Sequence, residues 1–140
     1  MRTLRLLVID DDSASRRACA EIFGELGCHV ETVGSGREAM STLDGERFDL
    51  ICLNPHLTDG SSAKVLAHLE PGQFVVGLTA DGANPPARFN GVIAKPVTKG
   101  SALITLLLAR IAKAGGRDRP DQDLTRAAPP TAAFIPALAS

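Results

Sequence analysis

The stretch Leu4-Arg5-Leu6-Leu7-Val8-Ile9-Asp10-Asp11-Asp12 decides the fold class of this chain. Its first part is almost entirely aliphatic, which predicts a strand buried on both faces, as in parallel sheets. The aspartates follow at once, where the strand ends. In open α/β sheets, ligands and chemistry collect at the carboxyl ends of the strands. We therefore expect an α/β fold with a polar site at that edge.

Short apolar runs and longer helical patterns alternate as far as residue 114. The runs predict strands at 4–9, 29–33, 48–53, 74–79 and 92–94, and the helical patterns predict helices at 13–26, 35–43, 62–69 and 99–114. Gly27 suits the end of the first helix, and Ser35 with Glu38 forms a capping box. This order predicts a doubly wound sheet of five parallel strands with helices on both faces.

Composition excludes several classes of function. The chain has 140 residues, 15 Lys and Arg against 16 Asp and Glu, and a net charge of −1, so it has no general attraction for nucleic acid or anionic membranes. No apolar run approaches the roughly 20 residues of a membrane span. The three cysteines lack CxxC spacing, so we expect a reduced, cytoplasmic protein.

The composition changes at Gly115. Four of the nine prolines fall within 115–140, and we expect a domain over 1–114 followed by a disordered Pro/Ala-rich tail. The tail ends in an apolar segment, Phe134–Leu138. We expect a frayed terminus there, with a docking peptide as the alternative.

Several motifs, in this order, resemble the receiver domain of two-component response regulators. They are Leu7-Val8-Ile9-Asp10-Asp11-Asp12 with Arg16, Phe48-Asp49-Leu50-Ile51-Cys52-Leu53, His56-Leu57-Thr58-Asp59-Gly60, Gly77-Leu78-Thr79-Ala80 and Ala94-Lys95-Pro96. The resemblance covers roughly residues 4–114. It implies a flavodoxin-like receiver fold with strand order 2-1-3-4-5.

The resemblance also implies roles for individual residues. Asp10 and Asp11 match the acidic pair that holds Mg²⁺ in the family, and Thr79 matches the hydroxyl that binds the phosphoryl group. Lys95 matches the cation of the site. Pro96 follows it as in the family, where the peptide bond is usually cis.

One position breaks the family pattern. Asn54 stands where the family has the aspartate that accepts the phosphoryl group. An amide has no ionised oxygen and cannot form the acyl phosphate. We therefore expect no required cofactor, and at most weak Mg²⁺ binding by Asp11 and Asn54.

The region that reports phosphorylation in the family also differs. Val92 occupies the position three residues before Lys95, where receivers often carry the aromatic side chain of a Thr–aromatic switch. Only twelve residues separate Thr79 from Val92, and they include Gly82, Pro85, Pro86 and Gly91. These residues predict a shortened or missing fourth helix.

Simpler roles exist for the same residues. The aspartates after the first strand are also suited to cap a helix. Lys95 is expected to form a salt bridge with Asp10 or Asp11. Cys52 is expected to pack as a small apolar residue, and His56 is expected to face solvent.

Two alternatives assign chemistry elsewhere. Asp59 is a possible relocated phosphoacceptor, although Asp-Gly pairs usually form turns. Asp10 and Asp12 resemble the nucleophile and acid–base pair of haloacid-dehalogenase-type phosphatases, but the later acidic pair and the cap insertion of those enzymes are not evident.

The last predicted helix is apolar over about 200° of its wheel, which is wider than the stripe of about 100° that one sheet covers. Part of it should be exposed in a monomer or covered by the tail, by a second copy or by a partner. We interpret the chain as a degenerate, non-enzymatic receiver that acts by protein–protein contact. Its expected partners are a histidine kinase or other signalling protein, or a second copy through the strand-five and last-helix face.

Overall fold

The computed structural model describes residues 3–80 and 87–118. Their elements are β1 (Arg5–Ile9), α1 (Ser13–Glu25), β2 (His29–Val33), α2 (Gly36–Gly45), β3 (Leu50–Leu53), α3 (Ser62–His68), β4 (Val75–Thr79), β5 (Gly91–Ala94) and α4 (Lys99–Asp118). Every predicted element is present, most with bounds within two residues of the expectation. The α/β alternation is therefore confirmed.

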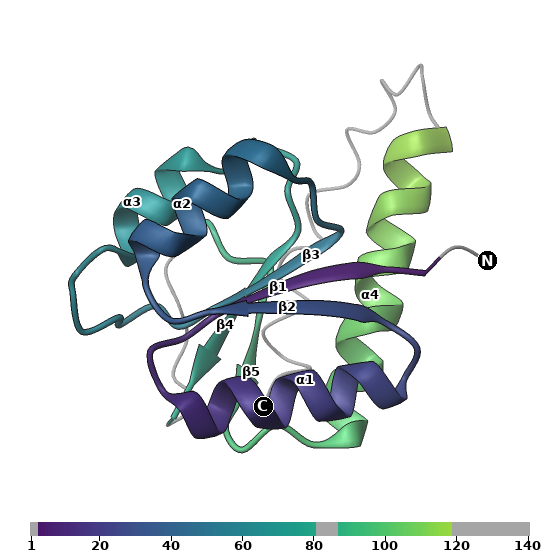
Figure 1. The fold of residues 1–140 in the computed structure, drawn as a ribbon. Coiled ribbons are helices and arrows are strands. Elements are labelled where there is room, and N and C mark those ends of the chain that lie inside the picture. The colour runs from purple at the N-terminus through teal and green to yellow at the C-terminus, as the bar shows by residue number, and fades with distance from the viewer. Residues whose placement is uncertain (1–2, 81–86, 119–140) are drawn as a thin grey trace.

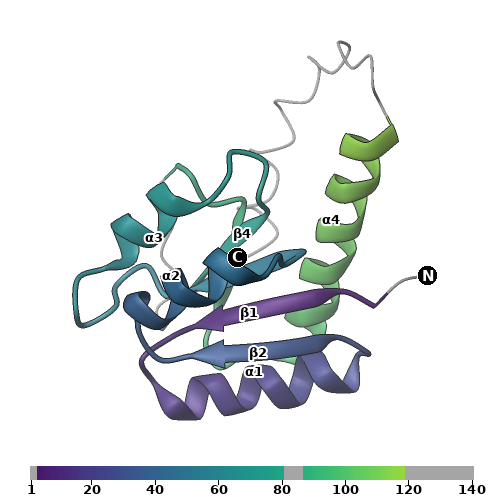
Figure 2. The ribbon, with the colours of Figure 1, turned by 45° about the horizontal axis from the view of Figure 1, so that its top comes forward.

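The strands form one parallel sheet in the order β2-β1-β3-β4-β5. Figure 2 shows β1 and β2 side by side and running in the same direction. This is the flavodoxin-like order that the resemblance implied. All five carboxyl ends therefore lie along one edge, and the residues that follow β1, β3, β4 and β5 gather there.

Two helices cover each face of the sheet (Figure 1). Helices α1 and α4 enclose one core, in which Cys19 and Phe23 pack against Leu6 and Val8. Helices α2 and α3 enclose the other, which includes Leu7 and Ile9. Successive residues of β1 thus enter opposite cores, which explains why the strand is aliphatic at nearly every position.

The helix ends follow their capping residues. Ser35 Oγ accepts a hydrogen bond from the Glu38 backbone N–H, as the predicted capping box requires. Glu38 Oε1 accepts from the Gly34 N–H, one residue before the N-cap, and not from the Ser35 N–H that a capping box uses. Gly27 follows α1 with φ of 92°, a conformation that a residue with a Cβ rarely adopts.

The bounds of α4 differ from the prediction. The helix ends at Asp118, so the expected end at 114 is wrong by four residues. Gly115 and Gly116 weaken a helix without stopping it. Residues 119–140, predicted as a disordered tail, lie outside the described residues.

The connection between β4 and β5 contains no helix among its described residues, Ala80 and 87–90. Residues 81–86 lie outside the described part. The four helices of the described chain agree with a shortened or missing fourth helix. None of these helices combines the length and apolarity of a membrane span.

Candidate functional site

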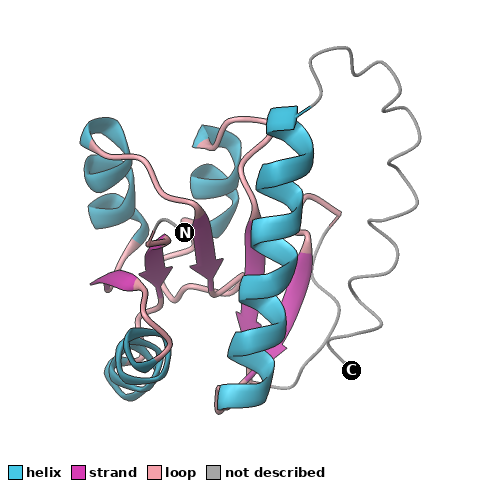
Figure 3. Cartoon of the chain, turned by 90° about the vertical axis from the view of Figure 1, so that its right-hand side faces the viewer, coloured by secondary structure: helices cyan, strands magenta, loops and turns pink. Residues whose placement is uncertain are grey.

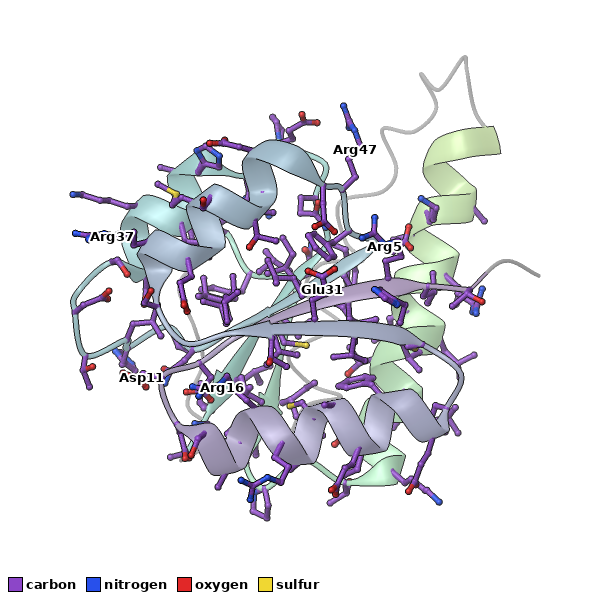
Figure 4. The ribbon with its side chains drawn as sticks, viewed as in Figure 1. Arg5, Asp11, Arg16, Glu31, Arg37 and Arg47 are labelled. Carbon is purple, nitrogen blue, oxygen red and sulfur yellow. The ribbon has the colours of Figure 1, made fainter. Side chains whose placement is uncertain are left out.

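The predicted site residues meet at the carboxyl edge of the sheet. Figure 4 shows Asp11 and Arg16 at this end of β1, and Arg5 and Glu31 toward the opposite end. Asp10 follows β1, Asn54 follows β3 and Lys95 follows β5. The topology therefore brings together side chains that are more than 40 residues apart in sequence.

Asp10 is the buried centre of this site. Its side chain is 0% exposed, and its Oδ2 lies 2.7 Å from Lys95 Nζ. At this distance the ammonium group and the carboxylate form a close ion pair. The expected salt bridge of Lys95 is thus confirmed for Asp10. Among the described residues, Lys95 also lies 4.0 Å from Asp12 Oδ2.

Asn54 is a hydrogen-bond partner of the other Asp10 oxygen. Its Nδ2 donates a hydrogen bond to Asp10 Oδ1 at 3.1 Å, and its Oδ1 accepts one from the His56 backbone N–H at 2.7 Å. These partners fix the orientation of the amide, because a flipped amide would set oxygen against oxygen and N–H against N–H. The Asn54 side chain is therefore held in place between a carboxylate and a backbone amide.

Asp11 points elsewhere. Its Oδ2 accepts a hydrogen bond from the Thr58 backbone N–H at 2.7 Å. Hydrogen bonding by the side chain and backbone of Thr58 lowers the pKa of Asp11 below its ordinary value of 3.8. Asp11 thus ties the start of α1 to the loop that follows β3.

The donor set does not fit a resident Mg²⁺, which needs several oxygen ligands around one point. Asp10 Oδ1 already accepts from Asn54 and from the Asp12 N–H, and Asp10 Oδ2 faces an ammonium group. The carbonyl oxygen of Asn54 is occupied by the His56 N–H. Within residues 3–80 and 87–118, no three His, Cys, Asp or Glu side chains form a potential metal set. Weak binding by Asp11 and Asn54 remains a prediction.

Asp12 and Arg16 serve the start of α1. Asp12 Oδ1 accepts a hydrogen bond from the Ala14 N–H and so caps the helix. Arg16 Nη1 donates to the Asp10 carbonyl oxygen at 2.7 Å. The capping role considered for the acidic cluster thus belongs to Asp12.

The loop after β3 is held by side chains. Asp59 Oδ1 accepts hydrogen bonds from the Ser61 N–H and hydroxyl, which lower the pKa of Asp59. Asp59 therefore has the turn-forming role that Asp-Gly pairs favour. His56 is exposed, as expected. Ser62 Oγ donates to the Asn54 carbonyl and accepts from the Leu57 N–H, and so fixes the loop to α3.

Thr79 is the last residue of β4, and Val92 lies within β5, three residues before Lys95. Thr79 is 4% exposed, and its buried hydroxyl has no hydrogen-bond partner among the described residues. Val92 is also buried. The Lys95–Pro96 peptide bond is cis, as the resemblance implied. An aliphatic side chain thus occupies the position of the family's moving aromatic ring.

The cysteines are free thiols. Burial raises the pKa of Cys52 well above its ordinary value and that of Cys19 to about 11. Cys52 packs in the core beside Leu50, which confirms its apolar role.

Sequence reasoning missed two elements of the site. Ser62 anchors the Asn54 backbone, and the Thr58 backbone N–H binds Asp11. A serine at the first position of α3, eight residues after Asn54, was the only available signal for the first. The Thr58 main-chain N–H gave no signal of its own, because every residue except proline carries such a donor.

Comparisons with known proteins agree with the resemblance. The model of the response regulator receiver domain family matches residues 6–106. The transcription factor SKN7 of Saccharomyces cerevisiae is 27% identical over 118 residues, which are 76% of this chain and 19% of that protein. SKN7 of Chaetomium thermophilum is 30% identical over 122 residues, which are 78% of this chain and 16% of that protein. The chain thus spans a fifth or less of these relatives.

Solved structures show the same fold. The chemotaxis response regulator CheY4 of Vibrio cholerae superposes with a TM-score of 0.65 at 20% identity, covering 77% of this chain and 99% of that one. A CheY-like receiver domain protein from Methanospirillum hungatei gives a TM-score of 0.70 at 24% identity, covering 82% of this chain and 100% of that one.

Proposed function

Because the chain belongs to the response regulator receiver domain family, we propose that it is a degenerate receiver that acts through protein–protein contact and accepts no phosphoryl group at residue 54. One observation carries this proposal: the neutral amide of Asn54 donates to Asp10 while Lys95 pairs with the same carboxylate. The Asp10 carboxylate thus has its partners within the chain itself.

The chemistry of the site supports this function. Formation of an acyl phosphate needs a carboxylate as the nucleophile, and the amide of Asn54 is not one. The cation that would stabilise transferred phosphoryl oxygens is already 2.7 Å from Asp10 Oδ2. A phosphoryl group would have to compete with a buried carboxylate for Lys95. Neither nucleophile nor free cation is available for the usual reaction.

Acetyl phosphate tests the proposal. The full chain is incubated with acetyl phosphate and Mg²⁺, and its intact mass is measured. We expect no gain of a phosphoryl group, whereas Asn54→Asp restores the acceptor and is the positive control. A hydroxylamine-labile phosphoryl group on the natural chain would overturn the proposal, and its loss in Asp59→Asn would establish a relocated acceptor.

The phosphatase alternative is not favoured by the site. Asp10 is buried and paired with Lys95, and Asp12 caps α1. Neither carboxylate is thus placed as a free nucleophile or acid. We propose that the chain is not an enzyme. Hydrolysis of p-nitrophenyl phosphate that disappears in Asp10→Asn would contradict this.

The partner surface is proposed to be α4 and β5. Leu103, Ile104, Leu107 and Ile111, here called the α4 ridge, are 43–66% exposed. Ile104 and Ile111 are seven residues apart, and Leu107 lies between them at the spacing of a helical seam. Isoleucine at one seam position with leucine at the other favours two-stranded parallel pairing of helices. We propose a second copy, or a histidine kinase or other signalling protein, as the partner.

Size-exclusion chromatography with light scattering tests this pairing. We expect a concentration-dependent dimer in the natural chain and a monomer in Leu107→Glu. Arg17→Glu, an exposed substitution on α1, is the matched control. A natural chain that stays monomeric at all concentrations contradicts the second copy and leaves a different signalling protein as the partner.

The net charge and the cysteines bear on what the protein binds and on the compartment in which it works. Its relatives are named as transcription factors, but the net charge of −1 gives this chain no general attraction for DNA. We propose that it binds no nucleic acid or membrane itself and works in the cytoplasm, where its cysteines stay reduced.

A further inference from the structure

A groove runs along the outer flank of α4. Its cavity has a volume of about 340 Å³, and its walls include Val92, Ala94 and Pro96 on one side and Ile104, Thr105 and Leu108 on the other. Strand β5 is the last of the sheet, so no strand covers this flank. The groove is therefore open to a chain segment that lies beside the sheet edge.

The groove adjoins the α4 ridge. All large apolar side chains that are exposed in the described part of the chain belong to this ridge. Ile104 belongs to both the ridge and the groove wall. Figure 3 shows α4 at the front of the molecule, with no other helix over its outer side. Apolar exposure confined to one patch marks a binding surface.

The chain carries a segment of matching chemistry. Phe134-Ile135-Pro136-Ala137-Leu138 has no charged or polar side chain. Pro136 disfavours a helical conformation of the residue before it and removes one backbone donor. In an extended form, five residues reach about 16 Å. The α4 wall of the groove, from Ser101 to Leu108, is about 10 Å long, so the segment is long enough to follow the groove.

The spacer also has a suitable length. Residues 119–133 separate α4 from the apolar segment. Fifteen residues reach at most about 50 Å. The distance along the helix from Asp118 back to Ile104 is about 21 Å. The spacer is therefore long enough for residues 134–138 to reach Ile104 within the same molecule.

We propose that residues 134–138 bind in cis in the groove between β5 and α4, as an extended peptide of the same chain. The segment covers Ile104 and thereby competes with the second copy proposed for the ridge. This inference does not depend on the phosphoacceptor position. It makes the C-terminal segment a regulator of how much of the α4 face is available to a partner.

A single tryptophan tests the contact. The chain has no Trp or Tyr, so Phe134→Trp in the full chain provides the only strong fluorophore. We expect emission at shorter wavelength and weaker quenching by acrylamide than in Thr131→Trp, a spacer position that serves as control. Equal emission and equal quenching of the two variants would overturn the proposal.

A second substitution identifies the groove. Adding Ile104→Glu to Phe134→Trp should remove the blue shift, because a carboxylate then lines the binding site. Adding Arg17→Glu should leave the blue shift unchanged. Far-UV circular dichroism confirms that each variant is folded. A blue shift that survives Ile104→Glu excludes this groove.

Concentration separates binding in cis from binding in trans. Emission of Phe134→Trp should stay constant when the protein is diluted, even where light scattering records dissociation of a dimer. A blue shift that is lost on dilution would show that the segment binds a second molecule and would overturn the intramolecular proposal. Neither result changes the acetyl phosphate experiment, so the two proposals fail independently.

Discussion

Asn54 Nδ2 lies 3.1 Å from Asp10 Oδ1 and donates a hydrogen bond to it. The other oxygen of this carboxylate is 2.7 Å from Lys95 Nζ. One negative charge, one positive charge and a neutral amide therefore form a balanced set in a buried position. A carboxylate at residue 54 would add a second negative charge at hydrogen-bond distance from the first.

We expect Asn54→Asp to be less stable than the natural chain at neutral pH without divalent cations. Repulsion between the carboxylates of residues 10 and 54 should lower the free energy of unfolding by about 2 kcal/mol. Mg²⁺ should restore most of this loss, because a cation between two carboxylates relieves the repulsion. Urea unfolding followed by circular dichroism measures both effects. Asn54→Ala is the control: it should lose about 1 kcal/mol with its hydrogen bond and show no response to Mg²⁺. Equal Mg²⁺ responses in the two variants would contradict the argument.

Breaking the ion pair between Lys95 and Asp10 should lower the free energy of unfolding by more than Asn54→Asp does. Lys95→Met leaves Asp10 buried and without its cation, and should lower the free energy of unfolding by about 3 kcal/mol. Adding Asp10→Asn should recover part of this loss. Lys99→Met is the control, because Lys99 pairs with Glu25 at 3.4 Å on the surface, with side chains 67% and 61% exposed. Its effect should be below about 1 kcal/mol. Similar losses of unfolding free energy in Lys95→Met and Lys99→Met would contradict the view that burial of Asp10 makes its ion pair important for stability.

Thr79→Val is expected to stabilise the protein. The Thr79 hydroxyl is buried and has no partner among the described residues, so replacing it by a methyl group removes a desolvated polar group and should gain about 1 kcal/mol. Thr105→Val is the control: the Thr105 hydroxyl is also buried in a 7% exposed residue, but it donates to the Ser101 carbonyl. Thermal unfolding compares the two. A lower melting temperature for Thr79→Val would show that its hydroxyl has a partner in solution.

Asp11 should contribute to stability in a pH-dependent way. Its pKa is lowered in the folded state by Thr58, so the folded state binds this proton less readily than the unfolded state. The contribution is therefore present above the ordinary pKa of 3.8 and is lost as the pH falls through the lower folded value. We expect the stability difference between the natural chain and Asp11→Ala to be largest near neutral pH and to shrink in acid. A difference that grows in acid would contradict the hydrogen bond to Thr58.

Glycine substitutions should have opposite effects in two helices. A Cβ on Gly36 would lie 1.9 Å from Ser61 Oγ, so Gly36→Ala forces α2 and α3 apart and should cost about 2 kcal/mol. A Cβ on Gly24 of α1 meets nothing within 4 Å, so Gly24→Ala should gain up to about 1 kcal/mol from helix propensity. Chemical denaturation of both variants tests the close approach of α2 and α3. Stabilisation by Gly36→Ala would exclude it.

The fold could be predicted because each strand carries its own signal. β1 is aliphatic on both faces, and the polar residues after β1, β3 and β5 mark one edge of the sheet. The strand order itself came from the resemblance, since periodicity gives no information on which strands are neighbours. The end of α4 was misplaced because two glycines after Ala114 favour a stop, although the helix continues to Asp118.

The inner geometry of the site was less predictable. The sequence indicated a salt bridge of Lys95 with Asp10 or Asp11, but the choice depends on side-chain direction after a buried strand. Asp11 turns to a backbone N–H of another loop, and main-chain donors leave no trace in a sequence. The asparagine at residue 54 could be read from the sequence. Its hydrogen bond to Asp10 could not, because that bond depends on how closely the ends of β1 and β3 approach each other.

The ion pair of Asp10 with Lys95 and its hydrogen bond with Asn54 also bear on how such a protein is controlled in a cell. A conventional relay varies its output by the fraction of molecules that are modified at a given moment. On the function proposed above, residue 54 accepts no phosphoryl group, so this molecule offers no such fraction. Its influence would then depend on how many copies the cell holds and on how much of the α4 face each copy leaves uncovered.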